Sequence, residues 1–219
     1  MSYLIGDFHN LDKLALICRG GSAIYLETHN DFSHCFVVGQ IDNLMTSIGS
    51  RLIDRKIVHI INKVSIVTDK TLYERYRIKD IQCNFGNKPD NTLSEGKTAL
   101  YKKVCSKNKH AKVHLSPVEV QRRKTTATQT WVTTGLFAVD LAAFFQPKNL
   151  YIYGLDFYDS DYLAREKINT SIAKNRRRAD EMVKNFLAIF KRDKDIKVTL
   201  FTYSDRVKSQ NNVTVSKVK

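Results

Sequence analysis

The stretch that decides the fold is WVTTGLFAVDLAAFFQPKNLYIYGLDFY, residues 131–158. It predicts a helix over about 134–145 and then a buried strand over 150–153. Polar and glycine residues stand at the start of the helix and at the end of the strand. In an open α/β sheet, ligands bind where the carboxyl ends of strands meet the amino ends of helices. The stretch therefore predicts two edges of a nucleotide pocket, at 133–135 and 154–158.

Strand and helix patterns alternate on both sides of this stretch. Apolar runs predict strands at 14–18, 34–38, 57–61, 81–85, 113–115 and 196–203. Helical patterns separate them at 23–28, 44–54, 69–79, 93–107 and 163–190. This alternation predicts a single Rossmann-like α/β domain, with a mostly parallel sheet and helices on both faces.

We place this domain at residues 1–206. Its lysine-rich middle, 86–130, is expected to form a lid or insertion above the pocket. The polar, basic residues 207–219 are expected to be a frayed tail.

The chain has 219 residues, 42% of them hydrophobic, which is enough for a buried core. None of its four cysteines stands in a CxxC pair, and three lie in apolar runs. This favours buried thiols and a reduced, cytoplasmic setting over disulfides. No apolar run reaches the roughly 20 residues of a membrane helix, and the first residues lack a signal-peptide pattern.

The net charge is +14, and lysines and arginines gather at 97–112, 122–124 and 174–178. Such a surplus suits an anionic ligand, nucleic acid or a peripheral contact with an anionic membrane, but it is equally typical of a solvated basic surface. The absence of a helix-turn-helix, zinc-finger or RNP motif weakens the nucleic-acid interpretation.

Two turns carry residues that are candidates to bind a phosphate. Gly20, Gly21 and Ser22 follow the first strand, where glycines let the backbone approach a phosphate, although an ordinary tight turn explains them as well. Thr133, Thr134 and Gly135 open a helix, so they suit an anion or are a plain helix cap. No GxGxxG or GxxxxGK[ST] motif is present, which disfavours P-loop chemistry.

The strand end at 154–158 carries the other candidates. Asp156 is predicted to accept hydrogen bonds from a ribose or base, and Tyr158 to donate one to a leaving phosphate. A turn aspartate and core aromatic residues are the alternative. Asp159 and Asp161 match the DxD pattern of metal-dependent glycosyltransferases, a weak signal at three residues. Among the histidines, His34 and His59 are predicted to be structural.

In order along the chain, these segments resemble the bacterial lipooligosaccharide sialyltransferases and their wider superfamily. The corresponding segments are LALICRGGS at 14–22, VHIIN ending at Asn62, the threonine-glycine helix start at 133–135, and GLDFY at 154–158. The last two are the specific ones. The resemblance implies a metal-independent α/β enzyme that binds cytidine monophosphate (CMP)-sialic acid.

The resemblance also implies roles for particular residues. Tyr158 would stabilise the leaving phosphate, and Tyr162 is a looser match to a second such tyrosine. The nucleotide-sugar pocket would be lined by Gly20, Gly21, Ser22, Gly39, Gln40, Asn62, Thr133, Thr134, Gly135, Gly154, Asp156 and Phe157.

The chain departs from the family at two places. Gly39–Gln40 stands where the family usually has asparagine-glutamine. The family's catalytic histidine, downstream of the tyrosine motif, has no counterpart in INTSIAKNRRRADEMV, residues 168–183. His110, His114 or Asp161 would have to replace it, because an acceptor hydroxyl needs a base within hydrogen-bonding reach.

The leading hypothesis is therefore a glycosyltransferase with a CMP-sugar donor, a glycan acceptor and no cofactor. One alternative is a non-catalytic nucleotide-, nucleic-acid- or partner-binding protein on the same fold. A weaker one is a metal-dependent transferase acting through Asp159 and Asp161.

Overall fold

The computed structural model describes residues 7–27, 31–61, 70–84, 95–117, 119–120, 123, 133–160 and 172–218, and only the backbone of 172–177. Helices and strands alternate within these ranges. They are β1 (Lys13–Ile17), η1 (Gly21–Glu27), β2 (His34–Val38), α1 (Asp42–Ile48), η2 (Gly49–Leu52), β3 (Lys56–Ile61), α2 (Lys70–Arg75), β4 (Asp80–Cys83), α3 (Glu95–Lys107), β5 (Lys112–His114), α5 (Thr134–Phe144), β6 (Asn149–Tyr153), α6 (Ile172–Arg192), β7 (Lys197–Thr202) and β8 (Val213–Lys217).

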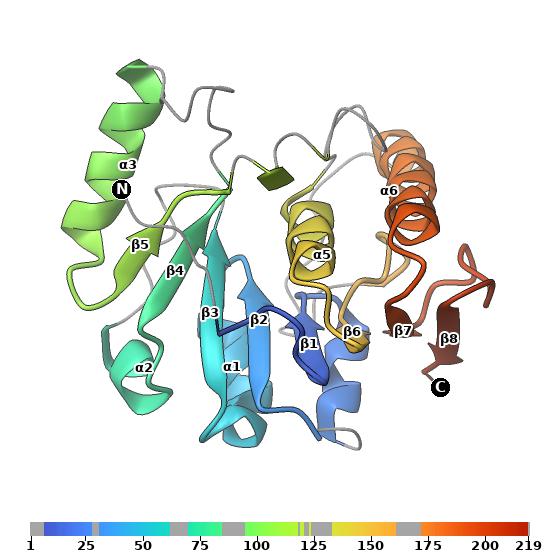
Figure 1. The fold of residues 1–219 in the computed structure, drawn as a ribbon, viewed down its shortest axis with the longest axis horizontal. Coiled ribbons are helices and arrows are strands. Elements are labelled where there is room, and N and C mark those ends of the chain that lie inside the picture. The colour runs from blue at the N-terminus through green and yellow to red at the C-terminus, as the bar shows by residue number, and fades with distance from the viewer. Residues whose placement is uncertain are drawn as a thin grey trace.

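The strands of the described residues form one eight-stranded sheet in the order β5-β4-β3-β2-β1-β6-β7-β8. Every neighbouring pair is parallel, so all the strands end at the same edge of the sheet (Figure 1). The predicted Rossmann-like α/β fold is confirmed. The sheet is parallel throughout these residues, where the sequence predicted a mostly parallel one.

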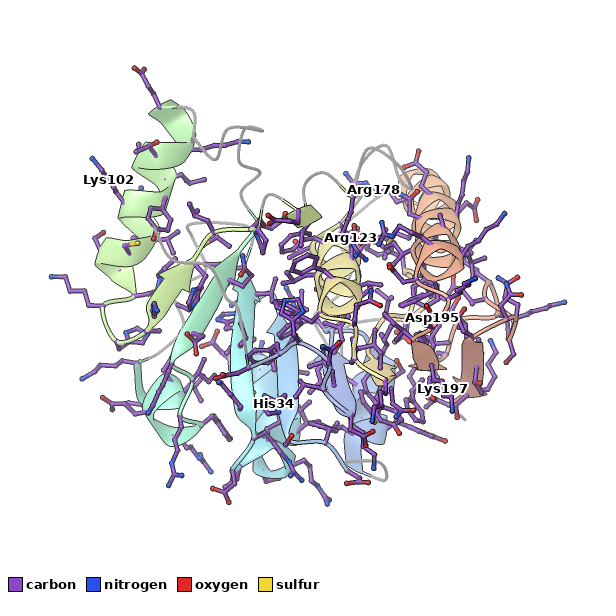
Figure 2. The ribbon with its side chains drawn as sticks, viewed as in Figure 1. His34, Lys102, Arg123, Arg178, Asp195 and Lys197 are labelled. Atoms are coloured by element: carbon purple, nitrogen blue, oxygen red, sulfur yellow. The ribbon has the colours of Figure 1, made fainter. Side chains whose placement is uncertain are left out.

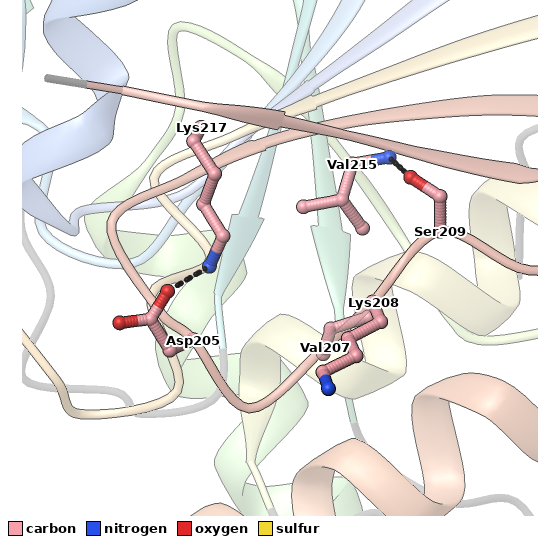
Figure 3. Close-up of a pocket in the computed structure, with 6 residues that line it drawn as sticks. All are labelled: Asp205, Val207, Lys208, Ser209, Val215 and Lys217. Carbon is pink, nitrogen blue, oxygen red and sulfur yellow. Dashed lines mark hydrogen bonds and ion pairs between the residues drawn. The ribbon is translucent and has the colours of Figure 1, made fainter.

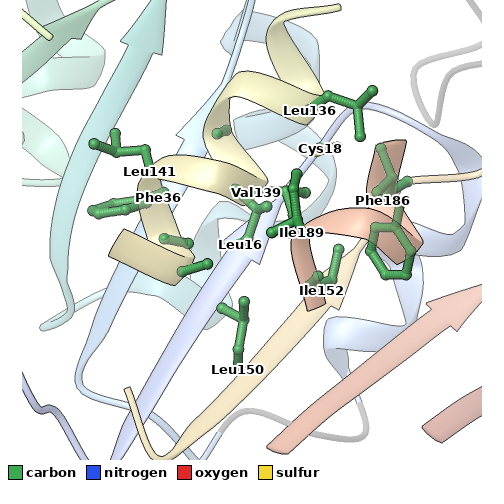
Figure 4. Packing of buried hydrophobic residues seen from close by; sticks show 14 of the residues in the cluster. Leu16, Cys18, Phe36, Leu136, Val139, Leu141, Leu150, Ile152, Phe186 and Ile189 are labelled. Atoms are coloured by element: carbon green, nitrogen blue, oxygen red, sulfur yellow. The ribbon is translucent and has the colours of Figure 1, made fainter. Parts of the chain in front are cut away.

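Each face of the sheet has its own hydrophobic core, because successive side chains of a strand point to opposite faces. On one face, Leu14 and Leu16 of β1 and their neighbours pack against α5 and α6 (Figure 4). On the other face, Ala15 and Ile17 belong to a core that includes residues of η1, α1, α2 and α3. Helices on both faces are what a buried parallel sheet requires.

Helix α5 is buried without interruption from Leu136 to Ala143. Its one charged residue there, Asp140, accepts hydrogen bonds from Arg123 Nε at 3.3 Å and Arg192 Nη2 at 2.5 Å. Both arginines also bind Asp193. A buried carboxylate is tolerated only when it is paired, so this network lets an otherwise apolar helix carry Asp140 and ties it to the end of α6.

One sequence prediction about the outer parts of the chain is wrong. The residues from 207 to 218 do not form a frayed tail, because β8 pairs with β7 in register from Val213 to Lys217. The alternating valines of VTVSK are sufficient for an edge strand, although the composition is polar. In the lysine-rich middle of the chain, β5 extends the sheet beside β4. Most of 86–94 and 121–130 lies outside the described residues, so the lid or insertion over 86–130 stays a prediction.

A pocket of about 410 Å³ lies beside β8 and is open to solvent. It is lined by Asp205, Val207, Lys208, Ser209, Val215 and Lys217 (Figure 3). All of these belong to the β7–β8 connection or to β8 itself, and none was predicted to bind nucleotide. Within the described ranges, no helix combines the length and the apolarity needed to cross a membrane.

His59 joins the sheet to the segments around it, as expected of a structural histidine. Its ring is fully buried on β3, with Nδ1 2.5 Å from the Tyr73 hydroxyl oxygen and Nε2 in contact with the Gly39 carbonyl. Burial disfavours the charged imidazolium and lowers the pKa of His59 to about 4.

We predict that His59 makes the protein less stable in mild acid. Between pH 6.5 and 4 the unfolded state binds a proton at this histidine and the folded state does not, so stability falls as the pH falls. The loss amounts to roughly 3 kcal/mol across that window. Urea unfolding of wild type and His59→Gln at several pH values measures it. The variant should show the shallower pH dependence, and equal slopes would contradict the assignment.

Candidate functional site

The strand order reverses its direction of growth between β1 and β6. From β1 the chain builds β2 to β5 outward on one side, and it later returns to build β6 to β8 on the other. This is the switch point of a doubly wound sheet, and ligands bind outside the carboxyl ends of the strands at such a point. The segments after β1 and β6 and the start of α5 meet there, and we call this the switch-point site.

The carboxylate of Asp156 organises this edge. Its Oδ2 accepts hydrogen bonds from Ser22 N at 2.9 Å and Ser160 Oγ at 2.6 Å. Its Oδ1 accepts from Thr202 Oγ1 at 3.0 Å and Tyr203 N at 3.1 Å. The side chain is buried, and these four bonds use the usual accepting capacity of a carboxylate. Asp156 therefore joins the ends of β1, β6 and β7, and the direct contact with a ribose predicted from the sequence would have to displace one of these donors.

Two glycines allow the turns after β1 and β6 to meet. A Cβ on Gly20 would lie 2.5 Å from Asp156 Oδ2 and 2.6 Å from the Gly154 carbonyl oxygen. Gly154 has φ +70°, and a Cβ on it would lie 2.4 Å from the Cys18 carbonyl oxygen. Gly154 N also donates to Ser22 Oγ at 3.0 Å. Gly20, Ser22 and Gly154 thus form a close backbone junction, with Ser22 fully buried inside it.

The amino end of α5 lies at the same edge. Thr133 caps the helix, because its Oγ1 accepts from Leu136 N at 3.3 Å. A Cβ on Gly135 would lie 3.3 Å from Leu155 Cδ1 and 3.6 Å from Cys18 Sγ, so this helix end sits beside the ends of β1 and β6. Helix amide groups and the positive end of the helix dipole favour an anion at this position.

Cys18 is not a nucleophile here. Its thiol is buried next to Asp156, and burial together with that carboxylate raises the pKa of Cys18 to about 12. The thiol therefore stays protonated at neutral pH, and its part in the site is packing.

The turn after β6 holds two consecutive residues in the left-handed region, Phe157 at φ 49° and Tyr158 at φ 64°. Residues other than glycine rarely adopt this conformation, and it costs of the order of 1–3 kcal/mol each. Phe157 is buried with its ring 5.6 Å from that of Phe186, so it belongs to the core rather than to a pocket wall. Tyr158 is half-buried and packs against the same hydrophobic core.

A second turn, after β2, completes the described edge. Gly39 has φ +84°, and its carbonyl oxygen is bound by His59. A Cβ on Gly39 would lie 3.1 Å from Arg19 Cδ, so the side chain of Arg19 lies over this turn. Gln40 is exposed, and Gly21 N donates to Ser160 Oγ at 3.1 Å.

The structure does not bring the predicted His114 to the switch-point site. His114 ends β5 and is buried with Nε2 2.6 Å from Asp80 Oδ1, an interaction that also lowers the pKa of Asp80. Four strand spacings separate β5 from β1, about 19 Å at 4.8 Å each. His110 is half-buried, and its ring meets that of Tyr73 edge-on at 4.5 Å between centroids, with Tyr73 in the core on the face of the sheet away from α5.

The remaining predicted residues fall into two groups. Asn62, Asp161 and Tyr162 lie outside the described residues. Asp159 is described, and it accepts hydrogen bonds from Ser204 Oγ at 2.5 Å and Arg206 Nε at 2.9 Å. This pairing leaves Asp159 poorly placed to hold a metal, and no cluster of metal-ligating side chains occurs in the described part of the chain.

Sequence reasoning missed the residues that support the site from β7. Thr202 and Tyr203 bind Asp156, and Ser204 and Arg206 bind Asp159. The segment FTYSDR, 201–206, has three successive hydroxyl-bearing residues at the end of a strand. That pattern is the sequence signal that could have identified it as part of the site.

Comparisons with known proteins agree with this fold. No protein-family model matches the chain, and no curated protein matches it in sequence. Solved structures do match it, at a TM-score of 0.55 in the three cases that follow.

The sialyltransferase CST-II in complex with a trisaccharide acceptor and CMP is 19% identical, over 86% of this chain and 80% of that one. CstII from Campylobacter jejuni in complex with the substrate analogue CMP-3FNeuAc is 16% identical, over 94% and 86%. The α-2,3-sialyltransferase Cst-I from Campylobacter jejuni is 16% identical, over 98% and 83%. The chain therefore has a divergent sialyltransferase-like fold.

We predict that Asp156→Asn destabilises the protein by about 2–4 kcal/mol, because an amide nitrogen would face donors that now bind a charged oxygen. Asp12→Asn is the matched control, since its side chain is 65% exposed and its change should stay within about 0.5 kcal/mol. Denaturant unfolding gives both values. Equal stability of the two variants would show that the Asp156 bonds do not hold the strand ends together.

Proposed function

We propose that this protein is a glycosyltransferase of the sialyltransferase-like class that takes its sugar from a CMP-activated donor. One observation supports this above the others. The turn after β1, the turn after β6 and the amino end of α5 converge at the switch point of a fold shared with enzymes described with CMP and CMP-3FNeuAc.

The donor is held by backbone and hydroxyl groups in this proposal. The amides of Thr134 and Gly135 and the hydroxyl of Thr134 bind the phosphate, at the positive end of the α5 dipole, while the amide of Leu136 is bound by the Thr133 cap. The Gly20–Gly21 turn lets the ends of β1 and β6 meet beside the donor, and Asn62 contacts the nucleoside. Asp156 positions these turns and does not itself touch the donor.

Transfer breaks the bond between the anomeric carbon and a phosphate oxygen and forms a bond from that carbon to an acceptor hydroxyl oxygen. The departing CMP gains negative charge, and the Tyr158 hydroxyl donates a hydrogen bond to its phosphate, with Tyr162 as a second donor. Stabilisation that grows in the transition state lowers the barrier.

The acceptor proton requires a base, and Asp161 is the candidate of choice. It follows Ser160, whose hydroxyl binds Asp156, whereas His114 is buried against Asp80 across the sheet. No step of this mechanism uses a metal ion.

A second candidate function is favoured by the charge around α2 and α3. Residues 70–84 and 95–117 carry ten lysines and arginines against three acidic residues. Lys102 and Lys103 of α3 are exposed, and Figure 2 shows Lys102 at the outer side of that helix. This surface suits an anionic macromolecule, so a protein that binds CMP without transferring a sugar, and also binds such a partner, is the alternative.

We predict that the wild-type chain binds CMP with a dissociation constant below about a millimolar, because the turn after β1, the turn after β6 and the amino end of α5 lie together at the switch point. Isothermal titration calorimetry measures this, with uridine monophosphate as the matched control for base selectivity. An absence of heat at millimolar CMP would refute the proposed function.

We also predict that Tyr158→Phe lowers the turnover of CMP-sialic acid roughly 100-fold, the usual scale for loss of one transition-state donor. The affinity for CMP should change little. Tyr203→Phe is the control, because Tyr203 is exposed and meets Asp156 only through its backbone. The assay is run with and without a chelator, and activity abolished by chelation would instead support the metal-dependent alternative. A wild type that binds CMP without any turnover would support the non-catalytic one.

A further inference from the structure

The turn that carries Tyr158 has an unfavourable backbone conformation. The amide of Asp159 donates to the Asp156 carbonyl oxygen at 2.8 Å, which closes a four-residue turn. Both central residues of this turn, Phe157 and Tyr158, have positive φ angles. Turns with two such residues are usually built from glycine, asparagine or aspartate, and aromatic residues remain in one only where the surrounding structure holds them. The contacts around the turn therefore determine where the Tyr158 side chain lies.

The segment after β7 binds a carboxylate on each side of these two central residues. Asp156, on one side, accepts hydrogen bonds from residues 202–203. Asp159, on the other side, accepts from Ser204 Oγ at 2.5 Å. Arg206 Nε also donates to Asp159, at 2.9 Å to Oδ1 and 3.1 Å to Oδ2. One short segment thus holds the strained turn at both of its ends.

Arg206 also joins this turn to helix α6. While its Nε binds Asp159, its Nη1 donates to Asp180 Oδ1 at 2.8 Å, because the planar guanidinium presents several donors in a fixed geometry. The side chains of Arg206 and Asp159 are 29% and 27% exposed, whereas that of Asp180 is 72% exposed. An ion pair gains more where water is partly excluded, so the contact with Asp159 is the stronger of the two.

The backbone that carries Arg206 is itself supported. The amide of Arg206 donates to Ser204 Oγ at 3.2 Å. Lys217 of β8 pairs with Asp205 at 2.8 Å (Figure 3) and donates to the Ser204 carbonyl oxygen. The edge strand β8 therefore contributes to holding the segment that binds the turn.

We propose that Arg206 is a positioning residue for Tyr158. By binding Asp159, the next residue along the chain, it keeps the strained turn in the conformation that presents the Tyr158 hydroxyl to the leaving phosphate. This inference rests on the proposed function, in which Tyr158 donates to that phosphate. A donor that is fixed before the reaction stabilises the transition state better than one that must reorient. Without Arg206, the turn would relax toward the negative φ angles that aromatic residues favour.

The test is a double-mutant cycle on the turnover of CMP-sialic acid, with wild type, Arg206→Gln, Tyr158→Phe and the double variant. Arg206→Gln should lower kcat roughly tenfold through misplacement of Tyr158 and leave KM within about twofold. In the Tyr158→Phe background, Arg206→Gln should change kcat less than about twofold, since the hydroxyl that it positions is already absent. Arg206→Lys should recover part of the loss, because lysine keeps the charge without the planar fork.

Lys208→Gln is the matched control, because Lys208 is an exposed cation in the same connection and its loss should leave kcat unchanged. Thermal unfolding shows whether each variant is folded at the assay temperature, and Arg206→Lys replaces Arg206→Gln in the cycle if the latter is unfolded. A wild-type kcat in the Arg206 variant, or two effects that multiply in the double variant, would overturn this inference alone. A wild type that does not turn over CMP-sialic acid would overturn the proposed function, and this inference with it.

Discussion

The site depends on one buried carboxylate. Asp156 accepts four hydrogen bonds from the segments that follow three adjacent strands, β1, β6 and β7. A neutral side chain of the same shape could not accept from all four donors. Because the donors come from separate parts of the chain, the carboxylate converts three independent turns into one rigid edge. The glycines at 20 and 154 have the same purpose, since a side chain at either would separate the turns that Asp156 joins.

A second buried carboxylate, that of Asp140, joins helices α5 and α6 in the way that Asp156 joins the strand ends. Asp140 is fully buried in α5, and its partners Arg123 and Arg192 come from the segment before that helix and from the end of α6. A buried charge is costly unless it is paired, so the two arginines allow α5 to pack against the sheet and α6 with Asp140 inside. The amino end of α5, where an anion would bind, is thereby fixed relative to β1 and β6.

The fold could be predicted from the sequence because apolar runs and helical patterns alternate clearly along the chain. The stretch 131–158 also shows clearly where one helix ends and the next strand begins. The site followed only in part. The predicted site segments do lie at one edge of the sheet, namely 20–22, 133–135 and 154–158. Their spacing could not reveal that the Asp156 carboxylate already accepts hydrogen bonds from Thr202 and Tyr203, some 46 residues away. The placement of His114 also depends on strand order, which local patterns do not encode. Strand β8 was not predicted, because its valines alternate with polar residues in a segment of polar composition.

Backbone junctions, more than individual side chains, join the segments of the switch-point site. Such junctions tolerate wide sequence change as long as the glycines at 20 and 154 and Asp156 remain. In the proposed function the acceptor hydroxyl depends instead on an individual side chain, and there the chain carries a run of arginines where the family that it resembles has a histidine.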